Sequence, residues 1–467
     1  MNRWFLFSCA AHLCAAQANA QWWQDAGLPA NAVYGVREVF HDTIANTLYC
    51  AGQMQAANGD PDRFWAFHNG EWTMSVPFDM PTETIIRFGD TLVVGGRFTM
   101  VDGQPFQYIV AFVDSQMIPF GSFDGGGGGL GVVRALRIIE GDLYAVGSFY
   151  TADGHGGCGG VAKRVGGSWF PVGNMPATHF YPTWVDIALY QGNLVVTGTT
   201  VFEGLPFKHI IQYNGQEWVP LGPGIQTGMG GGGTLAVYNN ELYVGGIFRL
   251  SEGNAGHCIM RWDGQAWYPV GTSVQDETGG YNYAIGVRKL IVKDGLLFAC
   301  GGFHYAGNVP AAFTATWDGD RWCGFGGSMD PFYGAMSMGF YGDTLFVGCG
   351  YMADGQPVNR LVRYIGETWG DSCSVPMGDF GMGITDAPTP QQELRLADLG
   401  DGRYRLLGVA ATGELRVYDA MGRLLRVLGL HAEADGTDPF DLSGLPTGGY
   451  LLDLAGQWRG HVTVVHW

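Results

Sequence analysis

Short apolar runs bounded by glycine-containing turns recur along most of the chain. One run reads LYVGGIF and begins at Leu242, and the turn Asp263-Gly264 follows it, embedded in RWDGQAWYPVG. Runs of this length between turn residues are typical of β-strands, because helices need longer segments with a period near 3.6. The pattern therefore predicts an all-β chain of short strands and tight turns.

The same run repeats at a regular interval. It begins at seven leucines spaced 44 to 55 residues apart: Leu48, Leu92, Leu143, Leu194, Leu242, Leu297 and Leu345. About 25 residues later a tryptophan follows in six copies: Trp72, Trp169, Trp218, Trp267, Trp322 and Trp369. Pairs such as Asn69-Gly70 and Asp263-Gly264 precede the tryptophan, and such pairs favour type I′ hairpins. Each unit thus reads as four strands.

Four strands and a period near fifty are typical of a propeller blade. We therefore predict a seven-bladed β-propeller over residues 21–375. The repeats resemble the Gly- and Trp-rich, kelch-like propeller repeats of bacterial surface proteins. The segment Gln21–Pro29 resembles a fourth strand without its partner, so either this segment or the strand at Trp369 closes the ring.

The repeat ends after Trp369, and a Gly- and Pro-rich linker at 376–390 precedes a Leu- and Arg-rich region at 391–467. Two of its segments resemble the C-terminal sorting domain of the bacterial type IX secretion system. The matching residues are Val417, Tyr418, Asp419, Gly422, Arg423, Asp441, Leu442, Ser443, Leu445 and Tyr450. The final HVTVVHW lacks the basic end usual in that family. The resemblance implies a small antiparallel β-sandwich, with the type IX secretion machinery as a partner.

Composition restricts the possible partners and the location of the protein. The net charge is −18 with only four lysines, which argues against nucleic acid as a partner. Residues 1–20 read as a signal peptide, and no later segment is apolar enough to be transmembrane, so we expect a secreted or outer-surface protein. Seven cysteines remain after cleavage of that peptide. An odd number leaves at least one unpaired in a monomer, and the pairing stays open.

Candidate ligand contacts lie in the long loops, on the propeller face opposite the short hairpins. They are four histidines and six aromatic residues: His155, His209, His257, His304, Phe106, Tyr108, Phe180, Tyr181, Tyr281 and Tyr283. The histidines lack a fixed metal-ligand spacing, so no metal or other cofactor is predicted. Acidic-Gly pairs such as Asp153-Gly154 and Asp354-Gly355 recur in the same loops. Recurrence in most blades favours a turn-forming role over cation binding or acid–base catalysis.

No nucleophile motif appears in the sequence, and no catalytic residue is predicted. A binding or adhesion module for an extracellular glycan, peptide or surface protein is therefore favoured over an enzyme. The alternative is an extracellular hydrolase or lyase that uses loop carboxylates and histidines at the channel mouth. A purely structural surface component is the third interpretation.

Overall fold

The protein is described by a computed structural model in which the chain divides into two compact units, residues 1–381 and 382–467. Residues described in the first unit are 22–29, 31–55, 62–126, 131–175, 182–201, 208–227, 230–275, 286–311, 313–329, 334–366, 369 and 372–373. Those described in the second are 395–400, 403–407, 413–418, 424–433, 436–446, 448–454 and 458–464. Almost all regular structure in these ranges is β-strand; the helical element among them is one 3₁₀ turn, η1 (Leu250–Glu252).

Antiparallel sheets of four or five strands build the described part of the first unit. The first sheet contains β2 (Asn31–Asp42), β3 (Thr47–Gln55), β4 (Trp65–His68) and β5 (Glu71–Met74). The second contains β6 (Thr82–Phe88), β7 (Thr91–Gly96), β10 (Ile109–Val113) and β11 (Gln116–Ile118). The third contains β13 (Val132–Ile139), β14 (Asp142–Ser148), β16 (Val161–Val165) and β17 (Ser168–Pro171). The next two contain β18 (Trp184–Tyr190), β19 (Asn193–Val201), β20 (Lys208–Tyr213) and β21 (Trp218–Pro220); β22 (Gly231–Tyr238), β23 (Glu241–Ile247), β24 (Ile259–Trp262) and β25 (Trp267–Pro269).

The last two of these sheets involve both ends of the unit. The sixth contains β27 (Val287–Lys293), β28 (Leu296–Gly301), β31 (Thr314–Trp317), β32 (Trp322–Gly324) and β38 (Ser372–Cys373). The seventh contains β33 (Ser337–Tyr341), β34 (Thr344–Gly348), β37 (Leu361–Tyr364) and β1 (Trp23–Asp25). Short strands in the loops are β8 (Met100–Val101), β9 (Gln104–Pro105), β12 (Phe123–Asp124), β15 (Thr151–Ala152), β26 (Val274–Gln275), β29 (Tyr305–Ala306), β30 (Val309–Pro310), β35 (Met352–Ala353) and β36 (Gln356–Pro357).

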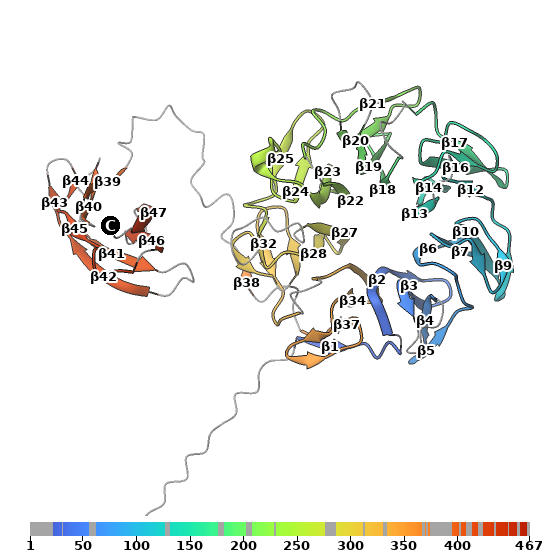
Figure 1. The fold of residues 1–467 in the computed structure, drawn as a ribbon, viewed down its shortest axis with the longest axis horizontal. Helices are drawn as coiled ribbons and strands as arrows, with labels where there is room; N and C mark the ends of the chain where they lie inside the picture. The colour runs from blue at the N-terminus through green and yellow to red at the C-terminus, as the bar shows by residue number, and fades with distance from the viewer. Residues whose placement is uncertain are drawn as a thin grey trace, which may run out of the picture. The chain divides into compact units, whose positions relative to one another are not determined.

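The sheets surround a common centre, with one strand of each innermost (Figure 1). Contacts run from β2 to β6, β13, β18, β22, β27 and β33, and β33 contacts β2 again. The described sheets thus close on themselves, and apolar clusters fill the space between neighbouring sheets. This arrangement is a β-propeller, so the prediction of an all-β propeller is confirmed.

The ring is closed by the N-terminal strand. β1 pairs antiparallel with β37, with Trp23 opposite Tyr364, and so supplies the outer strand of the seventh sheet. Trp23 therefore takes the place in the repeat that the spacing assigns to Trp369. Trp369 itself packs against the rings of Phe298 and Phe325, and the chain then adds β38 to the sixth sheet.

A disulfide links β38 to the sixth sheet. Cys323 on β32 lies opposite Cys373 on β38, and the two form a disulfide. The bond spans 50 residues of chain and ties the end of the propeller to its sixth sheet. The other cysteines in the described residues are all buried: Cys50, Cys158, Cys258, Cys300 and Cys349.

The second unit consists of two antiparallel sheets. One contains β39 (Arg395–Gly400), β40 (Arg403–Leu407), β43 (Ala432–Glu433), β44 (Gly436–Thr437) and β45 (Phe440–Asp441). The other contains β41 (Gly413–Tyr418), β42 (Leu424–Leu430), β46 (Gly448–Leu454) and β47 (Trp458–Val464). Side chains from both sheets form one apolar core, among them Tyr404, Val417 and Leu452. The unit is an antiparallel sandwich, as the resemblance noted in the sequence implies.

Candidate functional site: the central channel

A β-bulge recurs at one point of six innermost strands. The register of strand pairing shifts by one residue there, and the extra residues are Arg37, Glu83, Arg134, Val185, Gly233 and Arg288. A bulge re-aims the side chain of its extra residue. Each of these residues lines the central cavity, together with Met336, which immediately precedes β33.

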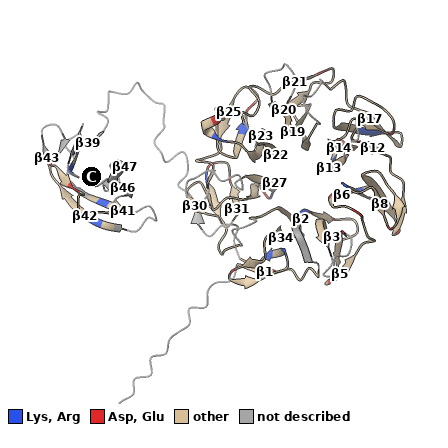
Figure 2. Cartoon of the chain, viewed as in Figure 1, with Lys and Arg blue, Asp and Glu red and all other residues tan. Residues whose placement is uncertain are grey.

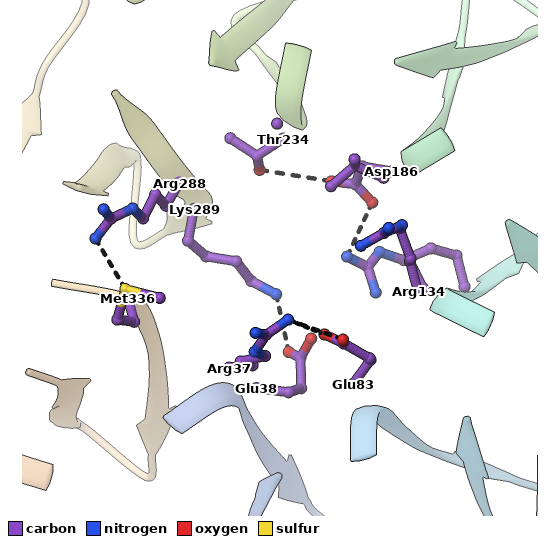
Figure 3. A pocket seen from close by; sticks show the side chains of 13 residues that line it. Arg37, Glu38, Glu83, Arg134, Asp186, Thr234, Arg288, Lys289 and Met336 are labelled. Atoms are coloured by element: carbon purple, nitrogen blue, oxygen red, sulfur yellow. Dashed lines mark hydrogen bonds and ion pairs between the residues drawn. The ribbon is translucent and has the colours of Figure 1, made fainter. Parts of the chain in front are cut away.

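The cavity has a volume of about 270 Å³. Its lining comes from all seven sheets: Arg37, Glu38, Glu83, Arg134, Ala135, Arg137, Val185, Asp186, Gly233, Thr234, Arg288, Lys289 and Met336. Charged side chains point into it from opposite sides (Figure 3), and the acidic and basic positions of the ring can be followed in Figure 2. The described lining has five basic and three acidic residues, an excess of positive charge in a protein whose net charge is −18.

Ion pairs connect blades across the channel. Arg37 donates to both carboxylate oxygens of Glu83 at 2.8 and 2.9 Å, joining the first and second sheets. Arg137 lies 2.9 Å from Asp186, joining the third and fourth. The ammonium of Lys289 on the sixth sheet reaches Glu38 on the first at 2.8 Å, past the seventh. These side chains are partly buried, so solvent screens the pairs less than it would at the surface.

Glu83 is shared by two guanidinium groups. Besides Arg37, Arg97 from the loop after β7 donates its Nε–H to Glu83 at 2.5 Å. Burial alone would raise the pKa of Glu83, but Arg37 and Arg97 outweigh burial and hold that pKa below its usual value. Glu83 therefore stays ionised and is a poor candidate for a general acid near neutral pH.

Arg134 lies beside this group without a carboxylate of its own. It forms no hydrogen bond or ion pair with a described residue, and its Nε is buried without an acceptor. Burial lowers the pKa of its guanidinium; the charge of Glu83 opposes this effect, while Arg97 and Arg37 add to it. The side chain is thus a partly desolvated cation beside two like charges, a costly arrangement unless an anion joins it.

The four predicted histidines are distributed over four blades, and none lines the channel. His155 is exposed and packs on Phe170, with 4.3 Å between ring centroids. His209 is buried, and His304 packs edge-on against Phe313. Burial, followed by the charge of Arg249, lowers the pKa of His257. The described residues contain no group of three or more His, Cys, Asp or Glu side chains arranged to hold a metal ion.

The predicted aromatic contacts are core residues where they are described. Phe106 and Tyr108 are each 8% exposed and belong to the apolar clusters between sheets. This burial leaves little ring surface for a ligand to stack on, so a contact role for them stays a prediction. Phe180, Tyr181, Tyr281 and Tyr283 lie outside the described residues.

The repeated acidic residues of the loops serve the architecture. Asp153 accepts the backbone N–H groups of Ser122 and Trp169 at 2.7 and 2.8 Å, linking the end of one blade to the outer strand of the next. Asp354 accepts the N–H groups of Trp22 and Trp23, and of Ser328 in the preceding loop, all within 2.8 Å. These carboxylates are used in backbone hydrogen bonds, as a turn-forming role requires.

The outer-strand tryptophans also join blades. The indole N–H of Trp169 donates to the carbonyl of Phe120 at 2.8 Å, and that of Trp218 donates to Val172 at 2.7 Å. Equivalent bonds run from Trp72 to Ala26, from Trp322 to Val270 and from Trp23 to Gly326. Each acceptor lies just after the outer strand of the preceding blade, so the repeated tryptophan connects neighbouring blades through a hydrogen bond.

In the second unit, Val417, Leu442 and Leu445 are buried in the sandwich core. Asp441 accepts the backbone N–H of Ser443 at 2.7 Å, and hydrogen bonds from Ser443 lower the pKa of this carboxyl. Tyr418 and Tyr450 lie on β41 and β46, which pair with each other. Asp419, Gly422 and Arg423 lie outside the described residues.

The channel residues were not singled out in the sequence, although a signal for them exists. The lining residue stands nine positions before the repeated leucine in six copies: Glu83, Arg134, Val185, Gly233, Arg288 and Met336. Three of these six residues, Glu83, Arg134 and Arg288, are charged although they stand in apolar strands, and a charge at a constant offset indicates that the strand is irregular there. Aligning the seven units at the leucine would have exposed this column.

The fold and its channel define the chain as a two-unit protein built on a β-propeller. No protein-family model matches the chain, and no curated protein matches it in sequence. Among the described residues, no helix has the length and apolar character needed to cross a bilayer.

Solved structures with similar architecture include PorZ, an essential surface component of the type IX secretion system of Porphyromonas gingivalis. The match covers 93% of this chain and 60% of PorZ, with 13% identity and a TM-score of 0.43. The chain thus corresponds to about 60% of the length of PorZ. The WD40 propeller domain of Doa1 matches 74% of this chain over 97% of its own length, with 14% identity and a TM-score of 0.42.

Proposed function

We propose that this chain is an exported β-propeller binding protein that holds its ligand in the central channel. The observation that carries the proposal is the ring of bulged side chains. Their backbone geometry repeats from blade to blade, while the residue type changes from Arg to Glu, Val and Gly. A rigid scaffold that points different side chains into one cavity is a typical arrangement for a ligand site.

Binding is a better match to the channel than acid–base catalysis. Each of its three carboxylates, Glu38, Glu83 and Asp186, is in an ion pair with a lysine or arginine. A hydrolase or lyase needs a carboxyl or imidazole free to exchange a proton with the substrate. The four histidines that the alternative function would use lie in four different blades, His209 on β20 and the other three in loops.

The test of this proposal is a binding screen with a blocked channel as its control. The purified protein is applied to glycan and peptide arrays, and bound ligands are then incubated with it to detect cleavage. Gly233→Phe places a ring in the channel, where an added Cβ would meet only backbone at 3.4 Å or more. Gly156→Phe places the same ring in an open loop with no atom within 4 Å of the Cβ.

We expect Gly233→Phe to abolish binding and Gly156→Phe to preserve it. Binding that survives Gly233→Phe would place the ligand elsewhere and refute the channel as the site. Cleavage that depends on the channel would replace the binding function with the hydrolase or lyase alternative.

We further propose that the second unit addresses the protein for type IX secretion to the cell surface or medium. Support comes from the sorting-type residues Val417, Leu442 and Leu445, which build the core of a separate sandwich. In a host with this secretion system, deletion of residues 391–467 should leave the propeller in the periplasm. Protease resistance of the retained fragment checks that it is folded. Normal delivery of the truncated protein to the surface would refute this role.

A further inference from the structure

The geometry points to an oxyanion as the group that the channel recognises, bound by Arg134 beside the Arg37–Glu83–Arg97 cluster. The ligand class is a small molecule that carries a carboxylate, phosphate or sulfate. This inference rests on the proposed binding function and deepens it by naming the chemistry of the ligand.

The local charge balance is the first argument. Three guanidinium groups, those of Arg37, Arg97 and Arg134, lie around one carboxylate, that of Glu83. Arg37 and Arg97 already donate to Glu83, so the carboxylate is occupied and the group keeps an excess of two positive charges. Arginine presents a planar set of donors that matches the oxygens of carboxylate and phosphate groups.

The remaining carboxylates of the lining cannot neutralise Arg134. Glu38 is paired with Lys289. Asp186 accepts from Arg137 through one oxygen and from the backbone N–H of Leu235, at 3.0 Å, through the other. Neither forms an ion pair with Arg134, so an anion from outside the protein is the natural partner for that guanidinium.

The position of Arg134 supports a ligand site. It lies in a bulge that aims it into the cavity, and Figure 3 shows it at the wall of the open space. The next two bulge positions, Val185 and Gly233, carry no charge and little bulk. The cavity, about 270 Å³, lies just below the range typical of drug-sized ligands, so a ligand about as large as one acidic sugar suits it.

Calorimetric titration of the full chain with four matched probes tests the inference. The probes are glucuronate, glucose 6-phosphate, glucose 6-sulfate and glucose. We expect at least one of the three anions to bind, and to bind at least tenfold more tightly than glucose, because a charge-assisted hydrogen bond to a desolvated guanidinium discriminates by about that factor. The relative affinities of the three anions distinguish carboxylate from phosphate and sulfate ligands.

Two sets of variants locate the site. Arg134→Gln should weaken anion binding about tenfold or more and leave folding intact, since Arg134 forms no hydrogen bond or ion pair with any described residue. Val185→Glu places a negative charge in the channel and should also abolish anion binding, whereas Val185→Gln, of the same shape, should not. Arg321→Gln is the charge-matched control, because Arg321 is exposed on the β31–β32 turn and pairs only locally with Asp318.

The outcomes separate this inference from the function on which it rests. Equal affinity for glucose and the anions, or channel-dependent binding of neutral array ligands alone, would overturn the oxyanion and leave the binding function intact. Anion binding that is unchanged in Arg134→Gln and Val185→Glu would also overturn it, by placing the anion outside the channel. No binding of any array ligand or probe would count against both.

Discussion

Replacing Trp218 with phenylalanine should destabilise the propeller by about 2 kcal/mol more than the same replacement at Trp267. Both tryptophans open the outer strand of a blade and pack against an aromatic ring of the neighbouring strand. The ring centroids are 5.3 Å apart for Tyr213 and Trp218 and 5.1 Å apart for Trp262 and Trp267. The loss of this ring pair therefore largely cancels in the comparison, while the deeper burial of Trp218 adds to the loss at that position.

The hydrogen bonds of the two indoles differ. Trp218 donates to the carbonyl of Val172 at 2.7 Å, while the buried indole nitrogen of Trp267 has no acceptor among the residues that the structure describes. Trp218→Phe removes this bond and leaves a buried carbonyl unpaired, at a cost of about 1–3 kcal/mol. Trp267→Phe removes an unsatisfied donor, which offsets part of its packing loss.

Urea unfolding measures the difference. The transition is followed by near-UV circular dichroism and by fluorescence, and free energies are taken where the two probes coincide. The midpoint should fall clearly further for Trp218→Phe than for Trp267→Phe. Equal losses of unfolding free energy, or a larger loss for Trp267→Phe, would refute the conclusion that the indole hydrogen bond stabilises the contact between blades.

Three further predictions concern other parts of the propeller. Asp354→Ala removes the acceptor of three backbone N–H groups and should cost about 3 kcal/mol more than Asp102→Ala, an exposed residue in the equivalent turn, when urea midpoints are compared. The double variant Cys323→Ser, Cys373→Ser opens a 50-residue loop and should lose about 4 kcal/mol; wild type in reductant should match it, and an unchanged midpoint would exclude a stabilising role. Burial raises the pKa of Asp62 to about 6. The ionised carboxylate therefore destabilises the folded protein fully above pH 6 and not at all below about pH 4. Asp62→Asn should therefore gain up to about 3 kcal/mol over wild type at pH 7 and nothing at pH 4, and a gain independent of pH would contradict this assignment.

Local sequence chemistry predicted the strands and most turn positions, because turn residues act within four positions of the chain. Asn69 and Gly70 both adopt positive φ, as the predicted type I′ turn requires. At Asp263-Gly264 only the glycine does. The carboxylate of Asp263 instead accepts the N–H groups of Gln265 and Ala266, so the hairpin loop is longer than the dipeptide suggests.

The channel could not be derived from local patterns, because its contacts join distant parts of the chain. Arg37 and Glu83 are 46 residues apart, and Lys289 and Glu38 are 251 apart. The Arg37–Glu83 pair forms when the first two blades pack together, and the Lys289–Glu38 pair forms only when the ring closes. Closure depends on β1, whose short segment gives a weak signal until β37 is available as its partner.

Residues that recur from blade to blade have structural roles in this protein, whereas residues that differ between blades line the proposed binding site. Where a side chain fastens one blade to the next, the same residue type recurs, as with the indole of Trp218 and the carboxylate of Asp354. At the bulge, the backbone geometry recurs from blade to blade while the residue type changes, and these residues line one cavity. A fold that needed only closure would place small or apolar groups there, because desolvating a cation without a partner is costly. The presence of Arg134 at that position is therefore best explained by a group that enters the channel from outside.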